Sequence, residues 1–167
     1  FTKELPPLSV VIRSRNESEN LRRFVPAILE QDYPLFEVIV INDGSTDKTD
    51  DILSSEQGFL YISQPNRGVS ASRNLGISLS SGEYILFLDA DDYFSENIFS
   101  LLDSHIEKNT DSDIYTFNYS INKTSMNKKM HTATIMSSHT VMHLFLHQKL
   151  HLCICSICIK HSFILEN

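Results

Sequence analysis

The sequence predicts an α/β fold, in which a mostly parallel β-sheet carries helices on both faces. Strand-like and helix-like segments alternate four times in the first 108 residues, which is the order that builds such a sheet. The segment from Tyr84 to Leu88 is apolar without alternation, as strands covered on both faces are. With 167 residues, 41% of them hydrophobic, the chain is long enough for one domain with its own core.

The first elements follow from two runs of apolar residues and the helix face between them. A β-branched run from Leu8 to Ile12 predicts the first strand. Asn16 and Glu19 have the spacing of a capping box at the start of a helix, and Pro26 predicts a kink inside that helix. The second strand is expected from Glu37 to Ile41. The apolar face of the helix consists of Leu21, Phe24, Val25, Ile28 and Leu29.

The later elements are marked by turn residues. The loop from Asn42 to Asp47 is rich in turn and cap residues and predicts a short helix after it. A third strand from Phe59 to Ile62 precedes a helix that Gly82 is expected to close, and the fourth strand comes next. Ser95 is expected to cap another helix. The remaining expected elements are a strand from Asp113 to Tyr119, a polar loop from Ile121 to Lys129 and a helix from His139 to Leu150.

Composition excludes several classes of protein. Fourteen Lys and Arg residues against 21 Asp and Glu give a net charge of −7, which argues against a nucleic-acid partner. No apolar run approaches the about 18 residues of a membrane span. The three cysteines, Cys153, Cys155 and Cys158, do not form a disulfide framework and are interpreted as small buried hydrophobic residues. A cytoplasmic location is therefore expected, at the inner face of a membrane if regions outside this chain anchor it.

Charged residues follow three of the predicted strands. The strands end at Arg13 to Glu17, at Asn42 to Ser45 and at Asp89 to Asp92. Ligands of open α/β sheets bind at the carboxyl ends of the strands, so these residues are expected at one site. Three carboxylates within four residues are costly unless a cation compensates them, and Mg²⁺ or Mn²⁺ prefers such ligands. Together with arginines, they predict a nucleoside-diphosphate site. The alternative is that the acidic loops only cap helices and stay solvated.

Four motifs carry a more specific resemblance. They extend from Val10 to Glu17, from Ile41 to Asp47, from Asn66 to Asn74 and from Gly82 to Asp92. In this order and spacing they resemble the family 2 glycosyltransferases, over about residues 8–95. The resemblance implies a GT-A fold, which is a Rossmann-like sheet. It also implies inverting transfer of a sugar from a nucleoside-diphosphate sugar, usually a UDP-sugar, to a hydroxyl of a glycan or lipid-linked acceptor. Glycan or cell-surface polysaccharide synthesis is the implied process.

The resemblance also implies roles for individual residues. Asp43 matches the aspartate that binds the base, Asp91 matches the one that holds Mn²⁺ or Mg²⁺ on the diphosphate, and Asp89 would lie against the ribose or the sugar. Arg73 is expected to reach the phosphates. The first loop would complete the nucleotide-sugar site with Ser14, Arg15 and Glu17.

The first and second loops depart from the family pattern. The first commonly reads Pro-Thr-Tyr-Asn, whereas this chain has Arg13, Ser14, Arg15 and Asn16. Arg15 thus replaces an aromatic residue that would stack on the base, and a guanidinium plane can stack in its place. In the second loop Asn42 replaces an aspartate, a change expected to be harmless.

The resemblance implies one GT-A domain over residues 1–167, truncated at its C-terminal end. The donor-binding part would span about residues 8–110, and a partial acceptor side about residues 111–167. The family's general base lies in an acidic motif well past Asp91. After Asp113 the only acidic residue is Glu166, to which we assign no such role. The base is expected beyond Asn167.

Two other functions remain open from the sequence. One is a non-catalytic module that binds a nucleotide sugar. The other is a different Mg²⁺-dependent α/β transferase for nucleotidyl or phosphoryl groups, although a phosphatase of that kind needs an aspartate where the first strand here ends in arginines. A zinc site at His143, His147 and His151 is less favoured than an exposed polar helix face, because no carboxylate or aligned cysteine completes the ligand set.

Overall fold

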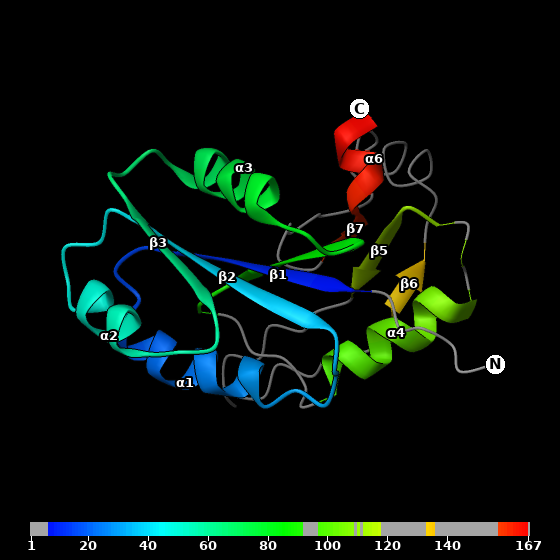
Figure 1. The fold of residues 1–167 in the computed structure, drawn as a ribbon, viewed down its shortest axis with the longest axis horizontal. Helices are drawn as coiled ribbons and strands as arrows, with labels where there is room; N and C mark the ends of the chain where they lie inside the picture. Colours follow the sequence, from blue (N-terminus) through cyan, green and yellow to red (C-terminus); the bar gives the residue numbers. More distant parts are fainter. Residues whose placement is uncertain are drawn as a thin grey trace.

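The computed structural model describes residues 7–91, 97–108, 110, 112–117, 133–135 and 157–166. Its strands form one sheet in the order β3-β2-β1-β4-β7-β5-β6 (Figure 1). The strands are β1 (Leu8–Ser14), β2 (Phe36–Asp43), β3 (Leu60–Gln64), β4 (Tyr84–Asp89), β5 (Ile114–Phe117), β6 (Ala133–Ile135) and β7 (Ile157–Lys160). The helices are α1 (Ser18–Leu29), α2 (Thr49–Ser55), α3 (Val69–Leu79), α4 (Ile98–Lys108) and α6 (His161–Glu166).

The mostly parallel sheet that the sequence predicts is confirmed. Strands β3, β2, β1 and β4 are parallel to one another, with Val10 of β1 between Val38 of β2 and Leu86 of β4. β7 lies between β4 and β5 and is antiparallel to both, and β6 is antiparallel to β5. β1 and β4 therefore lie in the middle of the sheet, where their apolar side chains can be covered on both sides.

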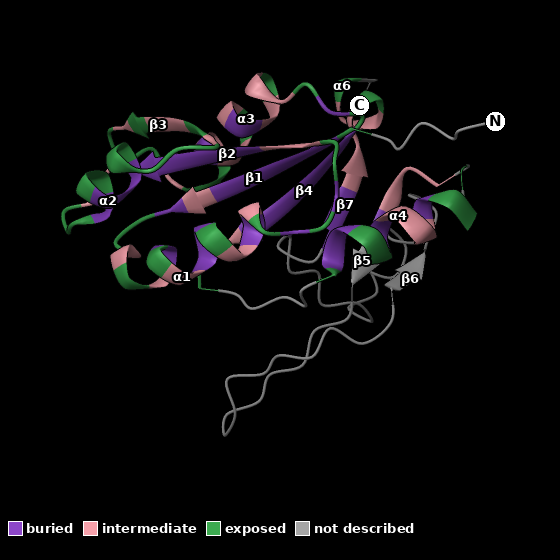
Figure 2. Ribbon diagram, turned by 60° about the horizontal axis from the view of Figure 1, so that its bottom comes forward, coloured by how far each residue is buried: buried purple, intermediate pink, exposed green. Residues whose placement is uncertain are grey.

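Helices cover both faces of the sheet, as predicted (Figure 2). Val10 and Ile12 of β1 point to one face, where they join a buried cluster with Phe24 of α1, Leu53 of α2 and residues of α4. Val11 points to the other face and packs with Ile85 and Phe87 of β4 and with residues of α3 and α6. Successive side chains of a strand alternate between faces, so covering both faces requires an unbroken apolar run.

Two glycines let the segment around α3 approach the sheet closely. A Cβ atom on Gly76, in the middle of α3, would overlap Cγ1 of Val11. A Cβ atom on Gly82 would lie 2.6 Å from the backbone nitrogen of Ser9. The prediction that Gly82 closes the helix is wrong, because α3 ends at Leu79 with Ser80 as its C-cap. Gly82 is instead required where the chain crosses the start of β1.

The start of α1 also differs from the prediction. Glu17, not Asn16, is the N-cap residue, and the Glu17 side chain forms no capping hydrogen bond. The Asn16 side chain is used elsewhere, because its Oδ1 accepts a hydrogen bond from the backbone N–H of Thr46 at 2.8 Å. The helix continues through Pro26 to Leu29.

Several predictions fall wholly or partly outside the described residues. β5 confirms part of the strand expected from Asp113 to Tyr119. Cys158 is fully buried in β7, and burial raises the pKa of its thiol, which confirms its interpretation as a small hydrophobic residue.

The helices in the described ranges are all too short or too polar to cross a membrane. Predictions outside the described residues concern Ser95, the loop from Ile121 to Lys129, the helix from His139 to Leu150 with its histidines, His151, Cys153 and Cys155.

Candidate functional site

The carboxyl ends of β1, β2 and β4 meet at one edge of the sheet. Ser14, the last residue of β1, pairs with Asn42 of β2, and Arg13 pairs with Asp89 at the end of β4. The charged strand ends that the sequence singled out are therefore brought together, as expected for parallel neighbours.

Asp43, at the end of β2, is a buried carboxylate surrounded by hydrogen-bond donors. It is 0% exposed, and its carboxylate accepts four hydrogen bonds from other segments. Oδ1 accepts from Nε2 of Gln64 at 3.0 Å and from the backbone N–H of Arg67 at 2.8 Å. Oδ2 accepts from the backbone N–H of Gly68 at 3.1 Å and from the Arg13 guanidinium at 3.4 Å.

Burial raises the pKa of the Asp43 carboxyl, but hydrogen bonds outweigh it. The Arg67 N–H, followed by the side chains of Gln64, Arg13 and Ser72, lowers that pKa to a net value below the ordinary 3.8. Asp43 is therefore ionised at neutral pH, and it ties β2 to β1 and to the loop that precedes α3.

Arg13 lies at the candidate site beside Asp43, although the sequence did not predict a role for it. Its side chain is 23% exposed and forms an ion pair with Asp43. Its Nε is buried and has no hydrogen-bond partner among the described residues. The signal in the sequence was the departure from the family loop at this position, where proline is usual.

The end of β4 combines two carboxylates with a second arginine. The Arg73 guanidinium lies 3.2 and 3.4 Å from the two carboxylate oxygens of Asp89. Both side chains remain partly accessible, 19% for Arg73 and 32% for Asp89. Asp91 is exposed, and Ala90 between the two aspartates is buried. Asp92 lies outside the described residues.

The donor atoms of this strand end suit a hard divalent cation. Mg²⁺ is typically held by one or two carboxylates, with oxygens from phosphates and water completing its coordination, and Mn²⁺ suits the same oxygen ligands. Asp89 and Asp91 supply two carboxylates at an accessible position. No group of three or more metal-ligating side chains occurs in the part of the chain that the structure describes, so phosphate oxygens would have to complete the site.

The other three predicted residues lie in the loop after β1. Ser14 is fully buried, and its Oγ has no partner within the described residues. Arg15 is exposed. Glu17 is half-buried, and its Oε2 accepts a hydrogen bond from Nδ2 of Asn20 at 2.6 Å.

Hydrogen bonds clamp this loop to the loop after β2. Asn16 has a left-handed backbone, with φ of 57°, a conformation that asparagine tolerates better than most residues. Its backbone N–H donates to Oγ of Ser45 at 2.9 Å, while its side chain accepts from Thr46. The backbone N–H of Ser18 donates to Oδ2 of Asp47 at 3.2 Å. These bonds hold the backbone that follows Arg15 against the loop that follows Asp43.

Asn42 organises the second loop from within. It is buried, and its Oδ1 accepts from the backbone N–H of Ser45 at 3.0 Å. Its Nδ2 donates to the hydroxyl of Tyr61 at 3.0 Å, and that hydroxyl donates to Asp50. An amide can donate and accept at once, whereas an ionised aspartate can only accept. Asparagine at position 42 thus fits its surroundings.

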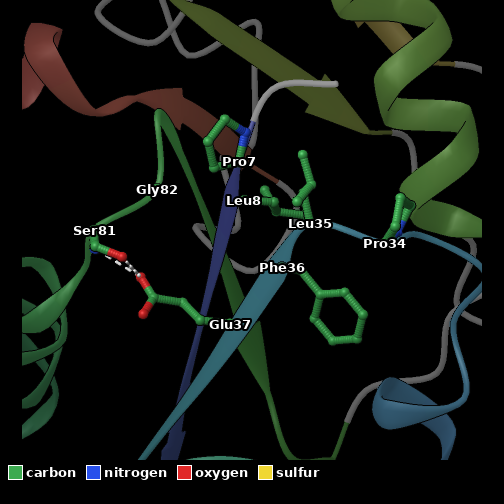
Figure 3. Close-up of a pocket in the computed structure, with 8 residues that line it drawn as sticks. All are labelled: Pro7, Leu8, Pro34, Leu35, Phe36, Glu37, Ser81 and Gly82. Atoms are coloured by element: carbon green, nitrogen blue, oxygen red, sulfur yellow. Dashed lines mark hydrogen bonds between the residues drawn. The ribbon is translucent and has the colours of Figure 1, made fainter. Parts of the chain in front are cut away.

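A cavity of about 260 Å³ lies at the opposite edge of the sheet (Figure 3). It is bordered by the amino ends of β1 and β2, with Leu35 and Phe36 among its lining residues. Its carboxylate, Glu37, already accepts hydrogen bonds from the Ser81 N–H at 2.6 Å and from Oγ of Ser9 at 2.6 Å. None of the predicted site residues lines this cavity. Its carboxylate instead links β2 to β1 and to the segment before β4.

Sequence comparisons give a consistent family match. The family model described as glycosyl transferase family 2 matches residues 9–166. Glycosyltransferase GlyA of Streptococcus pneumoniae is 34% identical, over 68% of this chain and 17% of its own length. Chondroitin synthase of Pasteurella multocida is 32% identical, over 71% of this chain and 13% of its own length. The chain therefore spans less than a fifth of the length of these two relatives.

Solved structures show the same fold. S. aureus TarS 1-349 superposes with a TM-score of 0.59 and 27% identity, over 65% of this chain and 34% of that one. The same protein has been solved in complex with UDP and with UDP-GlcNAc. The mannosyltransferase PcManGT of Pyrobaculum calidifontis, at 22% identity and a TM-score of 0.56, covers 67% of this chain and 35% of its own, and is similar in fold alone.

Proposed function

Because the chain belongs to glycosyl transferase family 2 and has the GT-A fold, we propose that it binds the donor in an inverting sugar transfer. The donor is a nucleoside-diphosphate sugar, and the acceptor is a hydroxyl of a glycan or a lipid-linked acceptor in cytoplasmic glycan or cell-surface polysaccharide synthesis. The observation that carries the proposal is the meeting of Asp43, Asp89 and Arg73 at one edge of the sheet. A uridine nucleotide is favoured because TarS, 27% identical over the aligned part, binds UDP and UDP-GlcNAc.

Each charged residue has a role in this proposal. The Asp43 carboxylate accepts from the ring N–H of the base, and Asp89 lies against the ribose or the sugar. Arg73, which Asp89 holds at the edge of the sheet, turns its remaining donors to the phosphates. Asp91 holds Mn²⁺ or Mg²⁺. A cation bound there would neutralise the charge of the departing diphosphate.

The loop after β1 completes the donor site. Arg15 is exposed beside the clamped loops, so that its guanidinium plane is free to stack on the base. Glu17 and the buried, unpartnered hydroxyl of Ser14 provide polar groups next to it. A buried hydroxyl without a hydrogen-bond partner is rare. A bound nucleotide sugar would offer such a partner to Ser14.

We also propose which parts of the chain bind the donor and the acceptor. We assign donor binding to about residues 8–110 and part of the acceptor side to about residues 111–167. No residue of this chain is assigned as the general base. We place that base in the part of the relatives that this chain does not span.

Calorimetry with UDP and Mn²⁺ tests the donor site. We expect UDP to bind in the presence of Mn²⁺, and Asp91→Ala to weaken binding about tenfold or more, since a charge-assisted contact contributes about 1.5–3 kcal/mol. Asp32→Asn, which removes an exposed carboxylate before β2 at the other end of the sheet, is the matched control and should bind like the wild type. Equal affinity in excess chelator would refute the role of the metal, and no binding of UDP would refute the donor site.

A module that binds a nucleotide sugar without transferring it is the second candidate. The observation that favours it is the absence of acidic residues between Asp113 and Glu166. Release of UDP from a UDP-sugar that depends on added acceptor glycan separates the two when it is measured on a protein that also includes the part in which we place the general base. Only a transferase shows it. The family match argues against the nucleotidyl or phosphoryl transferase.

A further inference from the structure

The Asp43 carboxylate has no vacant acceptor position in this structure. A carboxylate offers about four lone-pair positions, and Asp43 receives at least four donors. A base N–H can therefore bind Asp43 only by displacing one of them. Three of the donors lie at 2.8–3.1 Å, and the longest contact is that of Arg13 at 3.4 Å. Arg13 is the donor that is most easily displaced.

Arg13 also has hydrogen-bonding capacity that the described residues do not use. Its Nε is buried, and no acceptor among the described residues reaches it. A buried donor without an acceptor is costly, so a ligand oxygen placed there would be bound favourably. Asp89, the neighbour of Arg13 across the β1–β4 pairing, is held by Arg73 instead. Arg13 thus faces the base end of the proposed site, next to Asp43.

We propose that Arg13 reads the base of the donor by exchanging partners with it, an inference that rests on the proposed function. The ring N–H of uracil takes the place of Arg13 on Oδ2 of Asp43. The Arg13 guanidinium then donates to O4, the carbonyl oxygen next to that N–H. O4 lies on the edge of uracil away from the ribose, which is the edge that enters the buried end of the site when the ribose points towards the accessible Asp89.

This exchange discriminates between bases. Uracil presents a donor to Asp43 and an acceptor to Arg13, so both pairs are favourable. Cytosine presents a ring-nitrogen lone pair to the carboxylate and an amino group to the guanidinium, so both pairs are unfavourable. A site built around a buried hydrogen bond rejects an analogue that cannot form it, because buried polar groups are then left unpaired.

Arg67 offers a matched control for Arg13. Both arginines donate to Asp43, but Arg67 does so through its backbone N–H. Arg67 is also exposed to solvent. Replacing the Arg67 side chain removes a positive charge next to the site without removing a contact to Asp43. Arg13→Lys keeps the charge and loses the fork of donors, which separates charge from hydrogen-bonding geometry.

The experiment measures UDP, CDP and pyrophosphate affinities by calorimetry with Mn²⁺, for the wild type and for Arg13→Gln, Arg13→Lys and Arg67→Gln. We expect Arg13→Gln to weaken UDP about tenfold or more, while CDP and pyrophosphate change less than about threefold. Arg13→Lys should recover part of the loss, and Arg67→Gln should keep the preference for UDP over CDP. An equal loss for all three ligands would show a phosphate contact and overturn base reading, as would unchanged UDP affinity in Arg13→Gln.

A measurement on the wild type keeps the inference testable if Arg13→Gln does not fold. Substituting sulfur for O4 weakens the acceptor, so 4-thio-UDP should bind more weakly than UDP by about fivefold or more. Equal binding of the two nucleotides would overturn the contact with O4. Failure of the proposed function is distinct from both results, because in that case the wild type binds no uridine nucleotide.

Discussion

At the scale of single residues, Asp43 holds several segments of the fold together and is also the proposed ligand of the base. Its ionised carboxylate receives donors from β1, from the end of β3 and from the loop before α3. These contacts are stronger while the group is ionised, because a protonated carboxyl group accepts fewer and weaker hydrogen bonds. Removing the charge should therefore loosen the segments that form the proposed base site.

The pH dependence of stability tests this role of Asp43. Its pKa in the folded protein lies below the ordinary value of 3.8, so its stabilising contribution is complete above that value. The contribution is lost as the pH falls through the lowered pKa of the folded protein. We expect Asp43→Asn to be less stable than the wild type at neutral pH, and to lose less further stability below about pH 4.

Urea unfolding at a series of pH values measures this difference. Glu56→Gln, which removes an exposed carboxylate just after α2, is the control and should follow the wild type. If the free energy of unfolding of the wild type and of Asp43→Asn fell in parallel at acid pH, this stabilising role of the Asp43 carboxylate would be contradicted.

The residue scale also shows what local sequence patterns cannot predict. Candidate roles for Asp43, Asp89 and Arg73 could be proposed from the sequence, because these residues match motifs of the family that the chain resembles. A role for Arg13 could not, since it depends on an orphaned Nε and on a partner in another strand. The capping box of Asn16 failed for a similar reason. A hydrogen bond to Thr46, 30 positions away, replaced the local one.

At the scale of elements, α3 packs closely on β1 because Gly76 has no side chain. Gly76 lies in the middle of α3, where helix propensity favours alanine by about 1 kcal/mol. A methyl group there would overlap Val11, which is buried and has a stiff, β-branched side chain. Packing should therefore outweigh propensity at this position.

Gly76→Ala tests that balance. We expect the free energy of unfolding to fall by about 1–3 kcal/mol, as is typical of overpacked cores. Ser78→Ala, at an exposed position of the same helix, should stay close to the wild type, because only a hydrogen bond to the backbone of Leu75 is lost. An increase in stability for Gly76→Ala would show that α3 can move away from β1 without cost.

The order of the strands was only partly predictable. The parallel set from β1 to β4 follows from the alternation of strands and helices, since each helix carries the chain back to the same end of the sheet. The insertion of β7 between β4 and β5 could not be predicted. Its partners, including Leu86 for Cys158, lie far away in the sequence, and a short apolar run does not specify a pairing direction.

At the scale of the whole molecule, the two edges of the sheet have different characters. The carboxyl edge holds Asp43, Arg13, Asp89 and Arg73 in alternating charge, with polar groups left unpaired among the described residues. At the amino edge, the Glu37 carboxylate is satisfied by Ser9 and Ser81. We therefore expect a nucleoside diphosphate and a divalent cation to bind at the carboxyl edge.

Paramagnetic broadening by Mn²⁺ in the presence of UDP shows where the cation and the nucleotide bind. In amide NMR spectra of the chain, compared with the same complex with Mg²⁺, signals of Gly44, Gly68 and Ala90 at the carboxyl edge should broaden. Signals of Leu35 and Gly82, which line the cavity at the amino edge, should stay sharp. Broadening centred on Leu35 and Gly82, or a pattern that is the same without UDP, would contradict the account.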